Sequence, residues 1–323
     1  MHCNLQFLAA AAFAAFASFF TTTAAAQYPD KPIRLVVPFP PGGAAEVGAR
    51  IFSTPLSQAL GQPIVVDTKP GADGAIAADT VMKAAPDGYT IFYATNTAFN
   101  WVPVTRKNPP YDPLTDFTPV SFVGYFGFFL FSHPSVPAKN VAELIAYVRA
   151  NPGKLNYGSG NSTAQLFGAQ LMQLEKLDMV HVPYKGDGPL MVDLVGGRVH
   201  IAFATPGAAA PQVKDGKLRA LAAMFPSRSA LLPEVPTAAE AGLSKMSLTP
   251  WGGIFGPKGM SKEAVDRLAR ELAVVLKRED VRASFGKLAF EPKSSTPEEL
   301  TAILKQQTEV WGSVAREVGI KPE

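Results

Sequence analysis

The chain has 323 residues, of which 47% are apolar, enough to bury the cores of two domains of ordinary size. Its formal net charge is only +3 and its Lys and Arg residues are scattered singly, which argues against nucleic acid as a partner. The single cysteine is Cys3, so the chain beyond it has no disulfide, cysteine–metal site or cysteine nucleophile.

The N-terminal segment is predicted to be a secretory signal peptide. An apolar run at residues 7–20 is followed by three alanines at 24–26, a small-residue cleavage pattern before Gln27. The run is shorter than the roughly 20 apolar residues of a membrane-spanning helix. We therefore expect residues 1–26 to be removed near Ala26 and Gln27, leaving a soluble periplasmic protein.

The first predicted unit of the mature chain joins a strand, a glycine turn and a helix. The strand at residues 33–37 runs into Pro38-Phe39-Pro40-Pro41-Gly42-Gly43, and the helical pattern that follows ends at Gly61. Such a junction aims free backbone N–H groups at an anion. No Lys follows Gly43 as in a Walker loop and no third Gly completes a dinucleotide fingerprint, so a carboxylate suits the turn better than a phosphate.

A second copy of this unit follows directly. A strand at residues 63–67 leads into Pro70-Gly71-Ala72-Asp73-Gly74 and then into a helix at residues 75–84. Two such turns side by side can clamp one carboxylate. Gly and Pro also mark ordinary strand-to-helix loops, and for either turn alone that alternative stays open.

The next elements lead to a second lobe. A strand at residues 90–94 opens into Asn96 and Thr97, which we include among the ligand-facing candidates. The apolar region at residues 120–131 marks the crossing between lobes. A helix then begins after Asn140 in a capping-box pattern.

Polar residues at a helix start mark the second lobe. Ser159-Gly160-Asn161-Ser162-Thr163 follows a strand and precedes a helical stripe. One ordinary N-cap uses one such residue, so the others are candidates to face a ligand, and both interpretations stay open. His181 alternates with valines, which places it on a strand face rather than in catalysis.

The last part of the chain returns to the first lobe. After a helix at residues 188–195, a strand at residues 200–204 ends at Thr205, and residues 251–255 predict the return crossing. The remainder is predicted to be helical. We divide the mature chain into a first lobe at 27–125 and 250–323 and a second lobe at 126–249.

A series of motifs runs in order along the whole mature chain. They are Tyr28-Pro29, Pro32-Ile33-Arg34, Val37-Pro38-Phe39-Pro40-Pro41-Gly42-Gly43, Leu60-Gly61-Gln62-Pro63, Pro70-Gly71-Ala72, Ala85-Pro86-Asp87-Gly88-Tyr89, Tyr111-Asp112-Pro113, Asn151-Pro152-Gly153-Lys154-Leu155-Asn156-Tyr157, His181-Val182-Pro183-Tyr184-Lys185-Gly186 and Val235-Pro236-Thr237. With them the chain resembles the Bug/TctC family of periplasmic solute-binding proteins, the receptors of tripartite tricarboxylate transporters.

The resemblance implies an α/β fold of the flytrap type, a type II periplasmic binding protein with a ligand cleft between two lobes. It implies a monomer that holds a small organic acid without cofactor or metal and hands it to permease subunits similar to TctA and TctB. By position, the ligand-facing residues would be Gly42, Gly43, Ala44, Ala45, Gly71, Ala72, Asp73, Gly74, Ser159, Asn161, Ser162 and Thr205.

The chain departs from the family pattern at three places. Ala44-Ala45-Glu46 stands where the family has Ser-Thr-Asp, Thr68-Lys69 stands where many members have Asn-Arg, and Ala204-Thr205 stands where a strand commonly ends in Asp-Asn. The last change removes the acidic partner of a ligand ammonium, which argues against an amino-acid ligand because an unpaired buried ammonium is costly. Aromatic residues near the expected cleft, Phe99, Trp101 and Phe126, favour a more apolar acid if they line it, although burial in the core is the better expectation.

The predicted function is therefore a periplasmic receptor for a di- or tricarboxylate or an aromatic acid, and no bond is broken. One alternative is a secreted hydrolase with Ser159 or Ser162 as nucleophile. The chain has no Gly-x-Ser-x-Gly elbow at these serines, and its four His residues form no metal-type pair, so the sequence disfavours this alternative. Another alternative is a periplasmic sensor-input binding protein, which presents its closed form to a signalling partner instead of a permease.

Overall fold

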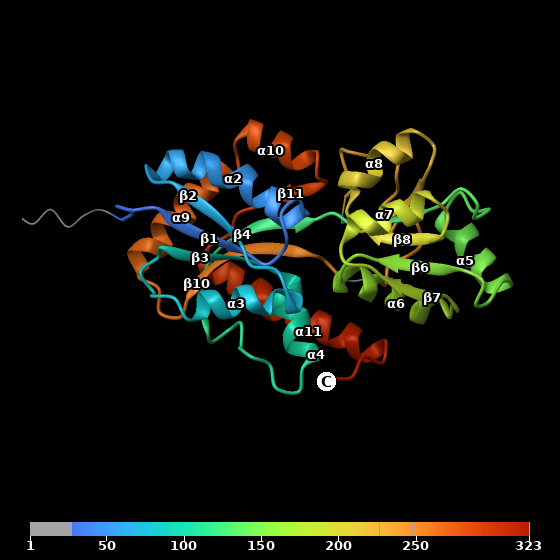
Figure 1. Cartoon of the computed structure of the whole chain (residues 1–323), viewed down its shortest axis with the longest axis horizontal. Helices are drawn as coiled ribbons and strands as arrows, with labels where there is room; N and C mark the ends of the chain where they lie inside the picture. The colour runs from blue at the N-terminus through green and yellow to red at the C-terminus, as the bar shows by residue number, and fades with distance from the viewer. Residues whose placement is uncertain (1–27, 226, 247, 323) are drawn as a thin grey trace, which may run out of the picture.

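The computed structural model describes residues 28–225, 227–246 and 248–322, so the predicted signal peptide lies outside the described residues. The chain forms two α/β lobes that lie side by side along the long axis of the molecule (Figure 1). Each lobe is built around one β-sheet. None of the helices in these three stretches combines the length and apolar character needed to cross a membrane.

The first lobe contains a six-stranded mixed sheet of order β11-β4-β10-β3-β1-β2. Its strands are β1 (Ile33–Val37), β2 (Ile64–Thr68), β3 (Thr90–Thr95), β4 (Phe117–Phe126), β10 (Trp251–Pro257) and β11 (Phe290–Pro292). Strand β1 is parallel to β2 and β3, while β10 is antiparallel to both β3 and β4. The apolar runs of β1 and β3 are buried, as expected for strands covered on both faces.

Helices cover both faces of this sheet (Figure 1). They are α2 (Ala44–Leu60), η2 (Ala72–Gly74), α3 (Ala75–Met82), the π-helical η3 (Thr97–Trp101), α4 (Val102–Thr105), α9 (Lys262–Val275), α10 (Glu279–Gly286) and α11 (Pro297–Glu317). The apolar stripes of α2, α9 and α10 pack on one face, and α3 and the start of α11 pack on the other. In α9 the stripe consists of Val265, Leu268 and Leu272, at the spacing of an amphipathic helix.

The second lobe contains a five-stranded sheet of order β7-β6-β8-β5-β9. Its strands are β5 (Phe129–Ser132), β6 (Asn156–Ser159), β7 (Val180–Pro183), β8 (Ile201–Ala204) and β9 (Arg219–Ala223). Its helices are α5 (Val141–Ala150), α6 (Ser162–Glu175), α7 (Asp187–Val195) and α8 (Pro206–Lys214). Helices α5 and α6 pack on one face, and α7 and α8 on the other.

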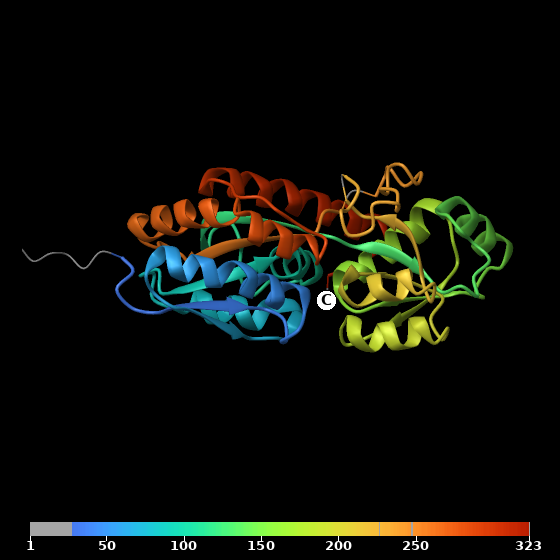
Figure 2. The same cartoon turned by 90° about the horizontal axis from the view of Figure 1, so that it is seen from above.

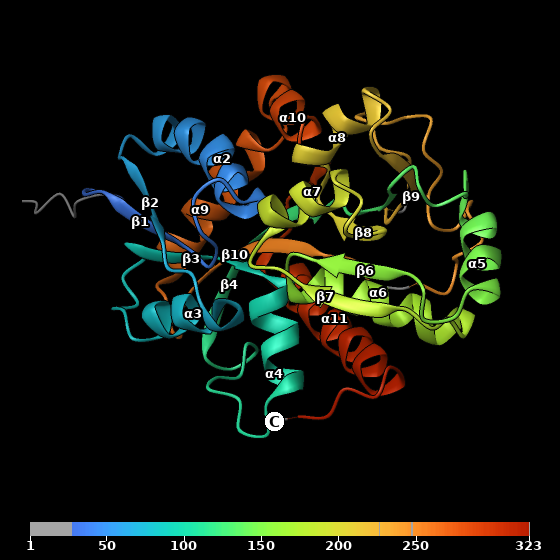
Figure 3. The same cartoon turned by 45° about the vertical axis from the view of Figure 1, so that its right-hand side comes forward.

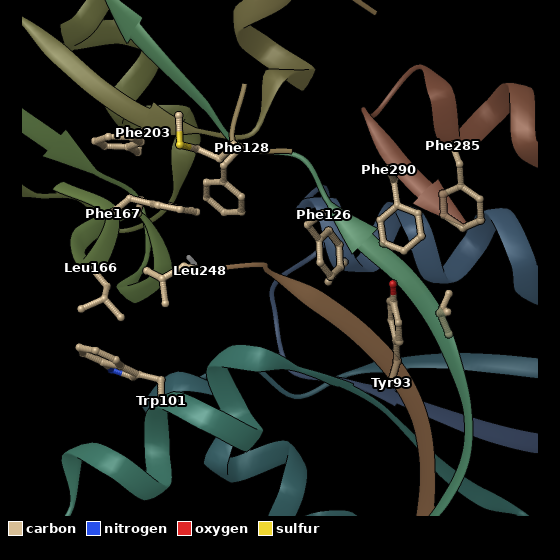
Figure 4. Close-up of a cluster of buried hydrophobic side chains, with 14 of the residues drawn as sticks. Tyr93, Trp101, Phe126, Phe128, Leu166, Phe167, Phe203, Leu248, Phe285 and Phe290 are labelled. Carbon is tan, nitrogen blue, oxygen red and sulfur yellow. The ribbon is translucent and has the colours of Figure 1, made fainter. Parts of the chain in front are cut away.

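The lobes are joined where β4 passes into β5 and where the chain returns into β10 (Figure 2). At the first crossing only residues 127 and 128 separate the two strands. Phe126 packs on Phe290 in the first lobe, with ring centroids 4.9 Å apart, whereas Phe128 packs on Phe167 in the second, at 5.6 Å (Figure 4). Strand β4 extends one residue beyond the predicted lobe boundary at 125/126, and β10 begins at Trp251, just after the predicted boundary at 249/250. The boundaries themselves stay a prediction.

The two lobes also touch away from these connections. Helix α6 of the second lobe contacts α11 and η3 of the first, and α6 and α11 lie next to each other at the boundary (Figure 3). Trp101 at the end of η3 lies opposite Leu166 of α6 (Figure 4). The two lobes are therefore packed against each other through α6, α11 and η3.

Local patterns predicted the helix starts well. The side chains of Asn140, Ser261 and Thr296 each accept a hydrogen bond from a backbone amide in the first turn of the helix that follows, as caps do. The expectation that everything after β10 is helical is wrong, because β11 adds a strand beside β4. Helix α8 and the π-helix η3 were not predicted.

Candidate carboxylate-binding cleft

The predicted ligand-facing residues gather at the carboxyl ends of parallel strands. From β1 the chain passes to β2 on one side, while β3 lies on the other side, so the loops after β1 and β3 border a crevice. In the second lobe the loops after β6 and β8 border a corresponding crevice, because β7 and β8 flank β6. In open α/β sheets such crevices are where ligands bind.

Direct hydrogen bonds bring the two crevices together. Ser162 Oγ donates to Asp73 Oδ1 at 2.6 Å, and Asn96 Nδ2 donates to Thr163 Oγ1 at 2.9 Å. The hydroxyl groups of Thr97 and Thr163 are 3.3 Å apart. Candidates from both lobes thus lie at one place, joined by Thr163, which was not among the predicted ligand-facing residues.

The first glycine turn places the start of α2 at the cleft. Helix α2 begins without a side-chain cap, and the first amides of a helix have no acceptor within it. The Gly42 amide is not among the free donors, because it donates to Glu46 Oε2 at 3.0 Å. Glu46 is buried and also pairs with Arg50. The Gly43 amide donates to the Pro40 carbonyl at 3.3 Å, so it is not free either. The donors that remain for an anion at this turn are the amides of Ala44, Ala45 and Glu46 in the first turn of α2.

The second glycine turn has an unusual backbone. Gly71, Ala72, Asp73 and Gly74 all have positive φ, at 125°, 49°, 57° and 93°. A Cβ on Gly74 would come within 2.9 Å of the Cβ of Ala98 in η3, so only glycine fits this conformation and this close approach. Consecutive left-handed residues are a form of backbone strain that occurs at ligand clamps.

The residues after β3 form a buried polar network. Asn96 is 3% exposed, and its Oδ1 accepts a hydrogen bond from the backbone amide of Trp251 at 3.2 Å. The indole Nε1 of Trp251 donates to Asn100 Oδ1 at 2.9 Å, and Asn100 Nδ2 donates to Thr308 Oγ1 at 3.0 Å. Trp251, the first residue of β10, therefore connects Asn96 at the lobe contact to Asn100 of η3, and Asn100 in turn is bonded to α11.

Two second-lobe candidates are committed to local structure. Asn161 is the N-cap of α6 and accepts a hydrogen bond from the Ala164 amide at 3.0 Å, which agrees with the ordinary N-cap interpretation for this residue. Ser159 is 3% exposed, and its Oγ lies 2.7 Å from Nε2 of His181 on the neighbouring strand β7. Burial lowers the pKa of His181, which favours the neutral ring.

Thr205 lies beside a carboxyl group that the sequence did not predict there. Its Oγ1 and its backbone amide donate to Oδ2 of Asp187, at 2.7 Å and 3.2 Å. The expectation that an acidic group is absent from this part of the second lobe is therefore wrong. Asp187 is the first residue of α7, which begins one residue earlier than predicted. The missed signal was an Asp directly after a glycine at a helix start, a common place for an acid.

The three aromatic residues near the cleft belong to the core. Phe99 packs between Phe117 and Phe255, with ring centroids 4.8 Å and 4.7 Å away. Trp101 and Phe126 are also buried, at 7% and 9% exposure. Burial agrees with the core interpretation, so these rings carry no argument for an aromatic ligand.

Comparison with known proteins identifies the family. Residues 48–320 match the model of the tripartite tricarboxylate transporter family receptor, TctC. The chain belongs to this family. It is also similar to protein BugT of Bordetella pertussis, with 34% identity over 313 residues, which are 96% of this chain and 96% of BugT. The resemblance noted in the motifs is confirmed.

Solved structures of similar proteins share the two-lobed fold of this receptor. A protein of R. palustris solved with adipate is 32% identical, with a TM-score of 0.84 over 92% of this chain and 100% of its own. MatC from Rhodopseudomonas palustris, solved with bound malate, is 30% identical, with a TM-score of 0.77 over 89% of this chain and 99% of its own. The periplasmic binding protein BugD is 31% identical, with a TM-score of 0.81 over 92% of this chain and 100% of its own. The receptor is thus a solute-binding protein of a family with carboxylate ligands.

Two cavities of the receptor lie away from the crevices. One of about 380 Å³ is lined by Arg34, Val65 and Asp67 on the β1–β2 side of the first sheet, where Arg34 and Asp67 pair with each other. The other, of about 220 Å³, is lined by apolar side chains such as Phe167, Met224 and Leu248 together with Ser244 and Thr249. Within the described residues, no group of three or more His, Cys, Asp or Glu side chains has the arrangement of a metal site.

Proposed function

We propose that the receptor holds one carboxylate of a small organic acid between the amides of Ala44 and Ala45 and the turn at residues 71–74. The observation that carries this proposal is the start of α2, which lacks a side-chain cap and opens into the first-lobe crevice. The positive end of a helix dipole and free amides together favour an anion. The hydrogen bond between Asp73 and Ser162 supports lobe closure at this point.

We infer that the ligand is a small organic acid that is bound through a carboxylate. The adipate and malate of the similar solved proteins support a small carboxylate. Ligand contacts to both lobes would stabilise the closed form, since a ligand shifts an equilibrium only through contacts that differ between its two states. The hydroxyl groups of Thr97 and Ser162 lie at the junction of the lobes, which supports such contacts, whereas Asn96 has both side-chain groups bonded within the protein.

We further propose that the chain is exported, cleaved near Ala26 and Gln27, and delivers its ligand as a monomer to permease subunits similar to TctA and TctB. The apolar run at residues 7–20 supports export, and the match to receptors of tripartite transporters supports the permease partner. The receptor would release its ligand chemically unchanged.

The pair of Ser159 and His181 is the one observation that favours a hydrolase. A serine bonded to a neutral histidine has the first two members of a catalytic triad. Ser159 is nearly inaccessible, however, and the hydrogen bonds described for His181 include none to a carboxylate that would orient its ring. The pair is better explained as a link between β6 and β7, and we propose that the receptor is not an enzyme.

The first test is a thermal-shift screen of the mature protein against dicarboxylates, tricarboxylates, aromatic acids and amino acids, followed by calorimetry and recovery of the acid. We expect a rise in the unfolding midpoint with one class of acid, because a ligand that binds the native state stabilises it by mass action. The acid should be recovered intact. Turnover, or no shift with any acid, would contradict the receptor proposal.

A pair of variants tests the location. Gly42 and Gly61 lie at opposite ends of α2, both have positive φ, and a Cβ at either would meet nothing within 4 Å. Gly42→Val and Gly61→Val therefore impose similar strain, but only the first places a branched side chain at the cleft. We expect Gly42→Val to weaken binding about a hundredfold, or ~2.7 kcal/mol, with little change in Gly61→Val. Equal affinities in the two variants would mean that the carboxylate binds elsewhere.

A further inference from the structure

The crevice of the second lobe contains a carboxyl group from a third element. Asp187 begins α7, yet its side chain lies between the loops that follow β6 and β8. On one side, Thr205 donates two hydrogen bonds to Oδ2. On the other, a Cβ placed on Gly160 would be only 2.3 Å from Oδ1. The carboxyl group therefore occupies the crevice, and the glycine at position 160 makes room for it.

One oxygen of this carboxyl group has no partner. Asp187 is half-buried as a residue, but Oδ1 is buried and accepts no hydrogen bond in the described part of the chain. No Lys, Arg or His in that part forms a salt bridge with it. A buried acceptor without a donor costs free energy, so such a group requires an explanation.

The buried acid of the first lobe provides a contrast. Glu46 accepts the Gly42 amide with one oxygen and pairs with Arg50 through the other, so both of its oxygens are used inside the protein. Asp187 has Thr205 alone. Burial raises the pKa of Asp187, and the two hydrogen bonds from Thr205 lower it by less. The second lobe therefore has an acceptor that still lacks a donor.

The position of Asp187 faces the expected far end of a ligand. The proposed carboxylate site is on the first lobe, and the loop that contains Gly160 continues to Ser162, which bonds to Asp73 of that site. A small acid bound by one end at α2 would direct its other end toward this loop and Thr205. This step rests on the proposed function.

We propose that Asp187 is a specificity-determining residue, which accepts a hydrogen bond from a hydroxyl or ammonium group at the far end of the ligand and disfavours a second carboxylate there. A charged acceptor makes a strong hydrogen bond with either donor. A second carboxylate would meet a like charge in a poorly solvated place, which is unfavourable. The preferred ligands are then hydroxy and amino acids rather than simple dicarboxylates.

The test compares acids of equal length by calorimetry at pH 8. One set is adipate, 6-hydroxyhexanoate, 6-aminohexanoate and hexanoate, and a shorter set is succinate, 4-hydroxybutyrate, 4-aminobutyrate and butyrate. We expect the parent protein to bind the better of the hydroxy and amino acids at least about tenfold more tightly than the matching dicarboxylate. In Asp187→Asn this preference should disappear or reverse, because the amide can donate to a carboxylate. A larger loss for the amino acid than for the hydroxy acid identifies ammonium as the donor.

The exposed Asp215→Asn change, at the end of α8, removes the same charge away from the crevice and should leave the preference unaltered. If Asp187→Asn does not fold, Asp187→Ser keeps a smaller polar group and serves for the same comparison. A parent protein that prefers dicarboxylates, or a preference unchanged in a folded Asp187 variant, would overturn the inference while the receptor function stands. No binding of any acid to the parent would remove the proposed function and this inference together.

Discussion

The crevices of the two lobes offer a ligand different kinds of polar group. In the first lobe the candidate donors are backbone amides at the start of α2, and the side chains of Asn96 and Glu46 are fully used within the protein. In the second lobe the candidate groups are side chains, and one of them, Asp187, has an oxygen to spare. Backbone amides recognise any carboxylate, whereas side chains change with the sequence without changing the fold. The first lobe is therefore suited to fix the class of ligand and the second to choose within it.

Among the variants that test this difference between the crevices, the largest effect is expected from a substitution in the first lobe. Asn96→Ala leaves the buried Trp251 amide without its acceptor and removes the donor to Thr163 Oγ1, which should lower the free energy of unfolding by about 2–4 kcal/mol. Urea unfolding of the ligand-free protein measures this change.

Asn151→Ala is the matched control, because this residue makes one side-chain bond, to the Tyr147 carbonyl, at the end of α5. We expect a smaller loss there, about 1 kcal/mol. If Asn96→Ala cost no more than Asn151→Ala, the network at the end of β3 would contribute little to stability, and the first crevice would be no better organised than the second.

An intermediate effect is expected from the unpaired acid of the second lobe. Burial raises the pKa of Asp187 above its value in the unfolded chain, so the folded state favours the protonated form. Its contribution to stability is fully present below the unfolded pKa of about 4 and is lost as the pH rises through the folded pKa. The amide introduced by Asp187→Asn cannot ionise, so this variant should not lose stability in this way as the pH rises.

Urea unfolding from pH 4 to pH 8 should therefore show the parent losing stability relative to Asp187→Asn as the pH rises. Asp215→Asn should follow the parent, since Asp215 is exposed. A constant difference between the parent and Asp187→Asn across this range would mean that Asp187 finds a donor in the free protein, and the contrast between the crevices would disappear.

The smallest effect concerns the bond between the lobes. Ser162→Ala removes the hydroxyl that donates to Asp73, an exposed contact worth about 0.5–1 kcal/mol. Because this contact exists only when the lobes meet, we expect a two- to fivefold loss of ligand affinity, about 0.4–1 kcal/mol, with little loss of stability.

Ser313→Ala provides the control, as its hydroxyl donates to Glu317 within α11 and joins no lobes. Calorimetry with the best acid of the screen distinguishes the two variants. Equal affinities would indicate that closure does not depend on the contact between Asp73 and Ser162.

Sequence patterns predicted what is local in the chain. The strand–turn–helix units, the glycine at the end of α2 and the capping residues Asn140, Ser261 and Thr296 depend on neighbours within a few residues. Crossing points at residues 120–131 and 251–255 were also predictable, because long apolar strands interrupt the helical pattern. These features were sufficient to predict the two-lobed fold.

What the sequence could not predict depends on distant neighbours. Asp187 reaches Thr205 only because β7 and β8 flank the same strand, which no local spacing encodes. The sequence pattern predicts a free Gly42 amide, whereas the side chain of Glu46 folds back and accepts its hydrogen bond. Strand β11 has three residues and gains its partner β4 from more than 150 positions earlier in the sequence. Contacts of this kind decide the site more than they decide the fold.

The central position of β10 has a consequence for the order of folding. This strand lies between β3 and β4 in the first sheet, yet the whole second lobe separates it from them in the sequence. When the chain is synthesised from its N-terminus, β3 can pair with β1, but its other edge and the edge of β4 that β10 covers have no partner until residue 257 has appeared. The second lobe, built from one continuous segment, can complete its sheet first, because contacts between distant segments form slowly. The lobe that is begun first is thus the last to be finished.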